Sequence, residues 1–149
     1  MEKFSVLLVE DNEGDILLTK EALESSRYIG QLTTLRNGQA AIDYLENTLE
    51  DRNAALPGII LLDINLPKKN GLEVLQYIKT HDKLKHLPVL MLTTSSAEKD
   101  IMTSYQNHAN CFISKPIQID DFMELISKVE EFWLNTVAIP NRKNISFHG

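Results

Sequence analysis

The feature that most constrains the fold is a regular alternation of short apolar runs with longer amphipathic segments. Each gap between successive runs holds a dozen or more residues, which is what parallel strand pairing through a helical crossover requires. The sequence therefore predicts an α/β fold, a doubly wound five-stranded parallel sheet with five helices. The strands are expected at Val6–Val9, Leu32–Leu35, Ile59–Asp63, Val89–Leu92 and Cys111–Ile113.

Apolar residues at helical spacing, with polar cap candidates and prolines nearby, mark the five helices. They are expected from about Asn12 to Ser26, around Ala40 to Leu45, from about Leu72 to Thr80, near Ala97 to Asn107, and from after Pro116 to about Trp133. Asn47 to Pro57 is predicted to be a polar surface loop. At 149 residues the chain is expected to form one domain over residues 1–134, followed by an extension over residues 135–149.

Composition excludes several partners. A formal net charge of −6 and a pI of about 5.2 disfavour binding to nucleic acid or to anionic lipid, both of which need clustered Lys or Arg. No apolar run reaches the length of a membrane helix, and no signal peptide is expected. The single cysteine, Cys111, cannot form an intramolecular disulfide, so we expect a cytoplasmic protein.

Polar side chains follow four of the expected strands, at the point where each strand ends. Glu10 and Asp11 follow the first strand, Asp63 ends the third, Thr93 follows the fourth, and Lys115 follows the fifth. In doubly wound sheets, ligands bind at the carboxyl ends of the strands. The sequence therefore predicts that acids, a hydroxyl and an amine converge on one site.

Three carboxylates in one small pocket repel one another unless some protonate or a cation joins them. An all-oxygen ligand set favours Mg²⁺, with Asp11 and Asp63 as direct ligands, the backbone carbonyl of Asn65 as a third, and Glu10 acting through water. Lys115 and the Thr93 hydroxyl, with Thr94 beside it, are then placed to hold a phosphoryl group. With Asp63 as the nucleophile, the predicted product is an aspartyl phosphate.

This ordered set resembles the receiver domain of bacterial two-component response regulators over about residues 4 to 134. The resemblance implies a flavodoxin-like fold with strand order 2-1-3-4-5, obligatory Mg²⁺ and a cis Lys115–Pro116 bond. It also implies that Asp63 accepts phosphate from a phosphohistidine on a sensor histidine kinase. The interval from Asp11 to Asp63 is longer than usual for the family, and we assign the excess to the loop at residues 47–57.

Three further segments are similar to the small regulators that partner cyanobacterial and other bacterial phytochromes. They are Leu66–Gly71, Leu92–Ser95 and Phe132–Pro140. The resemblance implies that the sensor kinase is a phytochrome.

Phe112 lies three positions before Lys115, where the family carries an aromatic switch, although it can also be read simply as a core aromatic. Movement of Thr93 toward a phosphoryl group would vacate space into which Phe112 could turn.

The last helix has a wider apolar arc than one domain face needs. Surplus apolar surface predicts a homodimer through the face made by the fourth helix, fifth strand and fifth helix. The alternative is a broad helix buried under its own tail. The residues expected at this interface are Leu125, Phe132, Trp133, Met102 and Tyr105, the last two of which could also be core.

Three functional hypotheses remain. The first is a phosphoacceptor signalling module that has no output domain and is not an enzyme acting on a separate substrate. The second is a phosphohydrolase, which would usually carry an aspartate where Asn65 stands. The third is an interaction domain that works without phosphorylation, against which the complete set of site residues argues.

Overall fold

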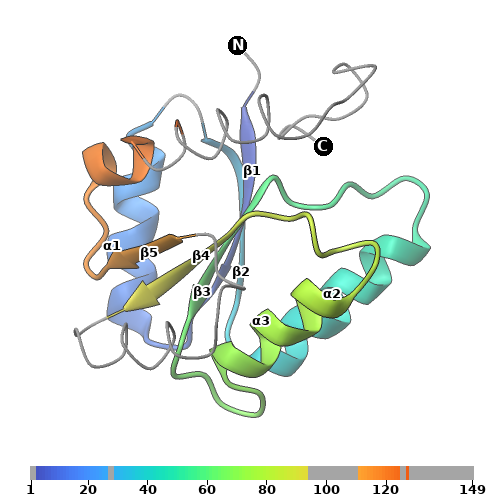
Figure 1. The fold of residues 1–149 in the computed structure, drawn as a ribbon. Helices are drawn as coiled ribbons and strands as arrows, with labels where there is room; N and C mark the ends of the chain where they lie inside the picture. The colour runs from blue at the N-terminus through green and yellow to red at the C-terminus, as the bar shows by residue number, and fades with distance from the viewer. Residues whose placement is uncertain (1–2, 27–28, 94–110, 125–126, 128–149) are drawn as a thin grey trace.

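The computed structural model describes residues 3–26, 29–93, 111–124 and 127. Its sheet has five strands in the order β2-β1-β3-β4-β5, and every neighbouring pair is parallel. This confirms the predicted fold and strand order (Figure 1). The strands are β1 (Phe4–Val9), β2 (Ile29–Leu35), β3 (Ile59–Asp63), β4 (Val89–Thr93) and β5 (Cys111–Ser114).

Each of the three complete helices in the described part of the chain begins after an asparagine. The side chains of Asn12, Asn37 and Asn70 each accept a hydrogen bond from a backbone N–H in the first turn, which satisfies a donor that the helix leaves free. The helices are α1 (Glu13–Glu24), α2 (Gly38–Glu50) and α3 (Gly71–Thr80). Residues 119–124 and 127 are also helical, where the last helix was predicted, whereas the predicted fourth helix lies outside the described residues.

The helices cover both faces of the sheet. Helix α1 and the helical residues 119–124 lie on one face, and α2 and α3 lie on the other (Figure 1). Alternate residues of β1 face the two layers, since Leu7 packs with α2 and α3 while Leu8 packs with Leu23 and Phe122. All five residues of β3 are buried, as are all five of β4. Burial on both faces is why these strands appear in the sequence as unbroken apolar runs.

The largest errors were at two predicted boundaries. Helix α2 continues to Glu50, so the loop before β3 begins at Asp51 and not at Asn47. Thr48 is buried in this last turn, and its hydroxyl donates to the carbonyl of Tyr44 at 2.7 Å. A polar residue that the sequence assigned to a loop is therefore part of the helix. Strand β2 begins at Ile29, earlier than predicted. The sequence did not show this start because β2 is an edge strand that is only partly buried, so its apolar pattern is weak.

No helix in the described ranges is both long enough and apolar enough to cross a bilayer.

Candidate functional site

The parallel sheet brings the predicted residues to one edge. Strand β1 pairs with β3 up to Val9 and Leu62, and β3 pairs with β4 up to Asp63 and Leu92. Strand β4 pairs with β5 up to Thr93 and Ser114. The residues that end or follow these strands are therefore neighbours across the sheet although they are far apart in the sequence.

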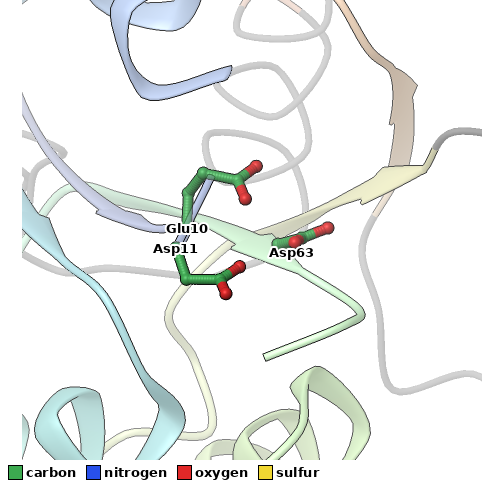
Figure 2. A group of neighbouring side chains, drawn as sticks. All are labelled: Glu10, Asp11 and Asp63. Atoms are coloured by element: carbon green, nitrogen blue, oxygen red, sulfur yellow. The ribbon is translucent and has the colours of Figure 1, made fainter. Parts of the chain in front are cut away.

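Glu10, Asp11 and Asp63 form an acidic cluster in which one carboxylate oxygen from each lies within 4.8 Å of the others. Figure 2 shows these three carboxylates gathered at the ends of the strands. Glu10 is 0% exposed and Asp63 is 5% exposed, whereas Asp11 is open to solvent. The cluster thus has two buried acids and one that an incoming ligand can reach.

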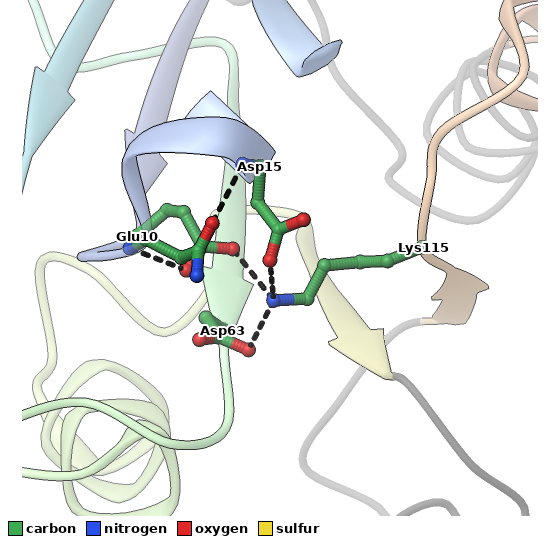
Figure 3. A network of polar contacts seen from close by, with 5 residues as sticks. Glu10, Asp15, Asp63 and Lys115 are labelled. Carbon is green, nitrogen blue, oxygen red and sulfur yellow. Dashed lines mark hydrogen bonds and ion pairs between the residues drawn. The ribbon is translucent and has the colours of Figure 1, made fainter. Parts of the chain in front are cut away.

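Lys115 is the cation that faces this cluster. Its Nζ lies 2.7 Å from Oε1 of Glu10 and 3.2 Å from Oδ1 of Asp63, and its side chain is 8% exposed (Figure 3). The other carboxylate oxygen of Glu10 accepts from the backbone N–H of Asn12 at 3.2 Å. Both oxygens of Glu10 are therefore engaged, which satisfies a buried charge that would otherwise be costly.

A third carboxylate at Lys115 was missed by the sequence reasoning. Oδ2 of Asp15 lies 3.0 Å from Lys115 Nζ (Figure 3). In the sequence Asp15 resembles an ordinary helix-capping acid, because it stands in the first turn of α1. The available signal was its position only four residues after Asp11, on the helix that leaves the site edge.

The electrostatics of the site raise the pKa of both Asp63 and Lys115, for different reasons. Burial, and then the negative charge of Glu10, raise the pKa of Asp63 from its ordinary 3.8 to about 7, against the opposing charge of Lys115. Burial by itself would lower the pKa of Lys115. Hydrogen bonds to Glu10 and Asp15, with the charges of Asp63 and Glu10, outweigh that effect and raise this pKa above its ordinary value.

Two backbone hydrogen bonds hold the loop that follows Asp63. The N–H of Gly71 donates to the carbonyl of Ile64 at 2.8 Å, and the N–H of Gly38 donates to the carbonyl of Pro67 at 3.3 Å. Within the same loop, directly after Pro67, Lys68 has a φ of 68°, in the left-handed region. Asn65 is exposed in this loop. The start of α2 and the start of α3 therefore clamp the loop that follows the central acid.

These residues fit a hard divalent cation. The donor atoms are all carboxylate oxygens, and the carboxylates of Glu10, Asp11, Asp15 and Asp63 outnumber the single ammonium of Lys115 that contacts three of them. Oxygen ligands and surplus negative charge are what Mg²⁺ requires. Asp11 and Asp63 would hold it, with Glu10 fixed beside them by Lys115 and Asn12.

The remaining predicted residues are placed in part. Thr93 is buried at the end of β4, and its carbonyl accepts from the N–H of Lys115 at 2.8 Å. Phe112 is half-buried and packs against the core on the side of α2 and α3. The Lys115–Pro116 bond is cis, as the resemblance implied. The predicted switch residue Thr94 lies outside the described residues. So do all the predicted interface residues, which are Met102, Tyr105, Leu125, Phe132 and Trp133.

The chain is similar to known proteins over most of its length. Residues 6–127 match the family model of the response regulator receiver domain. The chain is 44% identical to response regulator Rcp1 of Synechocystis sp. over 135 residues. The aligned region covers 91% of this chain and 92% of that protein. A solved structure of a Mn²⁺-bound form of Rcp1 is 43% identical, with a TM-score of 0.67 over 93% of this chain and 99% of that one.

Two other solved structures are similar. The bacteriophytochrome response regulator AtBRR is 39% identical with a TM-score of 0.80, covering 95% of this chain and 100% of that one. The phosphorylated cyanobacterial phytochrome response regulator RcpA is 44% identical with a TM-score of 0.69, covering 93% of this chain and 99% of that one. The matched range includes every strand-end residue of the site.

Proposed function

Because this chain belongs to the response regulator receiver domain family, we propose that it is a phosphoacceptor of a two-component pathway, phosphorylated on Asp63 in a Mg²⁺-dependent reaction. One observation carries the proposal. The Nζ of Lys115 lies 3.2 Å from a carboxylate oxygen of Asp63, beside the only group of three acids that could hold a metal ion in the described part of the chain.

The proposed step is a transfer from phosphohistidine to carboxylate. An oxygen of Asp63 forms a bond to phosphorus, and the phosphorus–nitrogen bond of the donor breaks. The electron pair stays on the imidazole nitrogen, which takes up a proton from solvent. The product is an aspartyl phosphate, and because the nucleophile is part of the protein, we propose an acceptor and not an enzyme that turns over a separate substrate.

The residues of the site have distinct roles in this step. Lys115 places its positive charge where the phosphoryl oxygens arrive, in a buried setting where the charge acts strongly. Glu10 holds Lys115 from the opposite side. When bound at Asp11 and Asp63, Mg²⁺ would neutralise charge on the phosphoryl oxygens and favour the ionised form of Asp63.

We also propose a signalling route through Thr93 and Phe112. Thr93 stands at the end of the strand beside Asp63, and Phe112 pairs with Met91 on the next strand. A Thr93 hydroxyl that moves to a phosphoryl oxygen would leave space next to the half-buried ring of Phe112. The ring could then change the surface made by β5 and its neighbouring helices.

For partners, we propose a phytochrome histidine kinase as the donor. The support is that the similar proteins AtBRR and RcpA are described as phytochrome response regulators. We also propose that the reaction takes place in the cytoplasm, where a histidine kinase would draw on ATP. We further propose that the protein forms a homodimer through its last helix. Light scattering with and without beryllofluoride, a phosphoryl mimic, measures whether dimerisation occurs and whether it depends on the phosphoryl group.

The phosphoacceptor function is tested by labelling. The protein is incubated with acetyl phosphate or with a phosphorylated histidine kinase, with Mg²⁺ or with EDTA, and analysed by intact mass and by its stability to acid and base. We expect one base-labile phosphoryl adduct that requires Mg²⁺ and is absent in Asp63→Asn. Asp82→Asn is the matched control, because Asp82 is a fully solvated acid whose side chain is 96% exposed.

The other outcomes identify the competing functions. Rapid multiple turnover of small phosphate esters would make the protein a phosphohydrolase. Absence of any adduct from both donors would make it an interaction domain that works without phosphorylation. A labelled Asp63→Asn variant would place the acceptor elsewhere.

A further inference from the structure

Asp15 has a different place in the site from the other acids that contact Lys115. Glu10 and Asp63 belong to the cluster that could hold a metal ion, whereas Asp15 does not. Asp15 instead reaches Lys115 from the first turn of α1, at 3.0 Å. Its backbone N–H donates to the side chain of Asn12 at 2.9 Å, so the cap of α1 fixes the position from which it reaches.

Three carboxylates already contact the Lys115 ammonium. An ammonium has three N–H groups, and that of Lys115 donates to Glu10 and to Asp15 and forms an ion pair with Asp63. A phosphoryl group on Asp63 would bring further oxygens that also need this ammonium. The phosphoryl oxygens would replace the contact with the Asp63 carboxylate and would compete with Glu10 and Asp15 for the same ammonium.

Burial decides which contact weakens. Of the two carboxylates that stay ionised, Glu10 has a side chain that is 0% exposed, whereas that of Asp15 is 30% exposed. A carboxylate that water can reach regains its hydration when it loses its partner, but a buried one is left uncompensated at a large cost. Asp15 also sits at the positive end of the α1 dipole, which supports its charge without Lys115. Release of Asp15 is the least costly change.

We propose that Asp15 is a positioning residue that holds Lys115 in the unphosphorylated protein and competes with the phosphoryl group for it. Asp15 thereby sets how tightly the phosphorylated state is held. This inference rests on the proposed function, since it assumes that the phosphoryl group occupies Asp63.

Binding of beryllofluoride tests the competition. The dissociation constant is measured by ¹⁹F NMR at a fixed Mg²⁺ concentration for the full chain and its variants. Asp15→Asn removes one acceptor charge but keeps the side-chain size, and we expect it to tighten binding about three- to tenfold. Glu13→Gln is the matched control, because it removes the same charge from the same helical turn. In the unaltered protein Glu13 pairs with Arg36 at 2.6 Å and not with Lys115. We expect this control to change binding less than twofold.

A second measurement detects the contact between Asp15 and Lys115 in the absence of a phosphoryl mimic and of metal. The ¹⁵N and ¹H resonances of the Lys115 ammonium are recorded in the metal-free protein and assigned by their loss in Lys115→Gln. We expect Asp15→Asn to shift these resonances and Glu13→Gln to leave them in place. A charge effect felt throughout the site would move them in both variants.

The outcomes separate this inference from the proposed function. Unchanged or weaker beryllofluoride binding in Asp15→Asn would overturn the competition, as would equal tightening in Asp15→Asn and Glu13→Gln. An unshifted Lys115 resonance in Asp15→Asn would overturn the contact itself. If the unaltered protein binds no beryllofluoride, or if Asp63→Asn binds it equally well, the proposed function fails, whatever the ammonium resonances show.

Discussion

Gly71 lies so close to the backbone carbonyl of Asp63 that a Cβ at residue 71 would overlap that oxygen and also crowd Ile64. The first residue of α3 is therefore packed directly on the backbone of the proposed phosphoacceptor. No side chain at position 71 fits unless the loop after β3 moves.

Gly71→Ala is accordingly expected to displace Asp63 and to impair both stability and phosphorylation. Because the added carbon meets backbone atoms and not a flexible side chain, we expect a loss of about 2–3 kcal/mol in the free energy of unfolding. Urea denaturation and the rate of adduct formation are the measurements. The control is Gly14→Ala, whose Cβ would lie 3.3 Å from the side chain of Asn12, and it should cost less than about 1 kcal/mol. Equal effects of the two variants would argue against the packing explanation.

The raised pKa of Asp63 predicts that stability depends on pH. A folded-state pKa of about 7, against an ordinary 3.8, means that the folded protein binds the proton more tightly than the unfolded chain does. Stability contributed by this group is therefore lost as the pH rises between these two values. Without metal, Asp63→Asn should raise the free energy of unfolding by about 3 kcal/mol at pH 8 and by clearly less at pH 5.

This prediction is checked by urea denaturation in EDTA at both pH values. Addition of Mg²⁺ should stabilise the unaltered protein at pH 8 and reduce its difference from Asp63→Asn, because the cation supports the ionised carboxylate. Asp82→Asn again serves as the control, with its solvated side chain. A gain that is the same at pH 5 and pH 8 would show that ionisation of Asp63 is not its cause.

Removal of Lys115 is expected to be costly because its partners are buried. Lys115→Met leaves Glu10 at 0% exposure with one charged contact fewer, and we expect a loss of about 3 kcal/mol at pH 8 without metal. Part of this loss should return with Mg²⁺, which can take over the compensating charge. Chemical denaturation with and without Mg²⁺ measures both effects. Lys83→Met, at an exposed position, should stay within about 0.5 kcal/mol of the unaltered protein, and a similar loss there would refute the role of burial.

The capping box at the start of α3 predicts a smaller effect on stability. The side chain of Asn70 accepts from the N–H of Glu73 at 2.9 Å, and the Glu73 side chain accepts from the N–H of Asn70 at 3.2 Å. Asn70→Ala should cost about 1 kcal/mol, because it leaves a helix N–H without its partner. Thermal denaturation measures the loss, and Asn53→Ala at an exposed loop position is the comparison. An unchanged melting temperature in Asn70→Ala would contradict a stabilising cap.

The sequence by itself determined the order of elements and the identity of the residues at the strand ends. Apolar runs such as Ile59–Asp63 are buried on both faces of the sheet, so their composition alone marks them as strands. Because parallel strands end at one edge, the order of elements also predicted that Glu10, Asp63 and Lys115 would meet. Local pattern was a poorer guide where a polar residue such as Thr48 is buried inside a helix turn.

Only the tertiary structure decided which atoms at that edge contact one another. Asp15 and Lys115 are separated by 100 positions, and their contact depends on where the first turn of α1 leaves the sheet. The same holds for Gly71, whose packing on Asp63 depends on how the loop after β3 is clamped by Gly38. Periodicity in a sequence records which face of its own element a residue occupies. Distances between side chains of different elements are fixed by packing, which no local pattern contains.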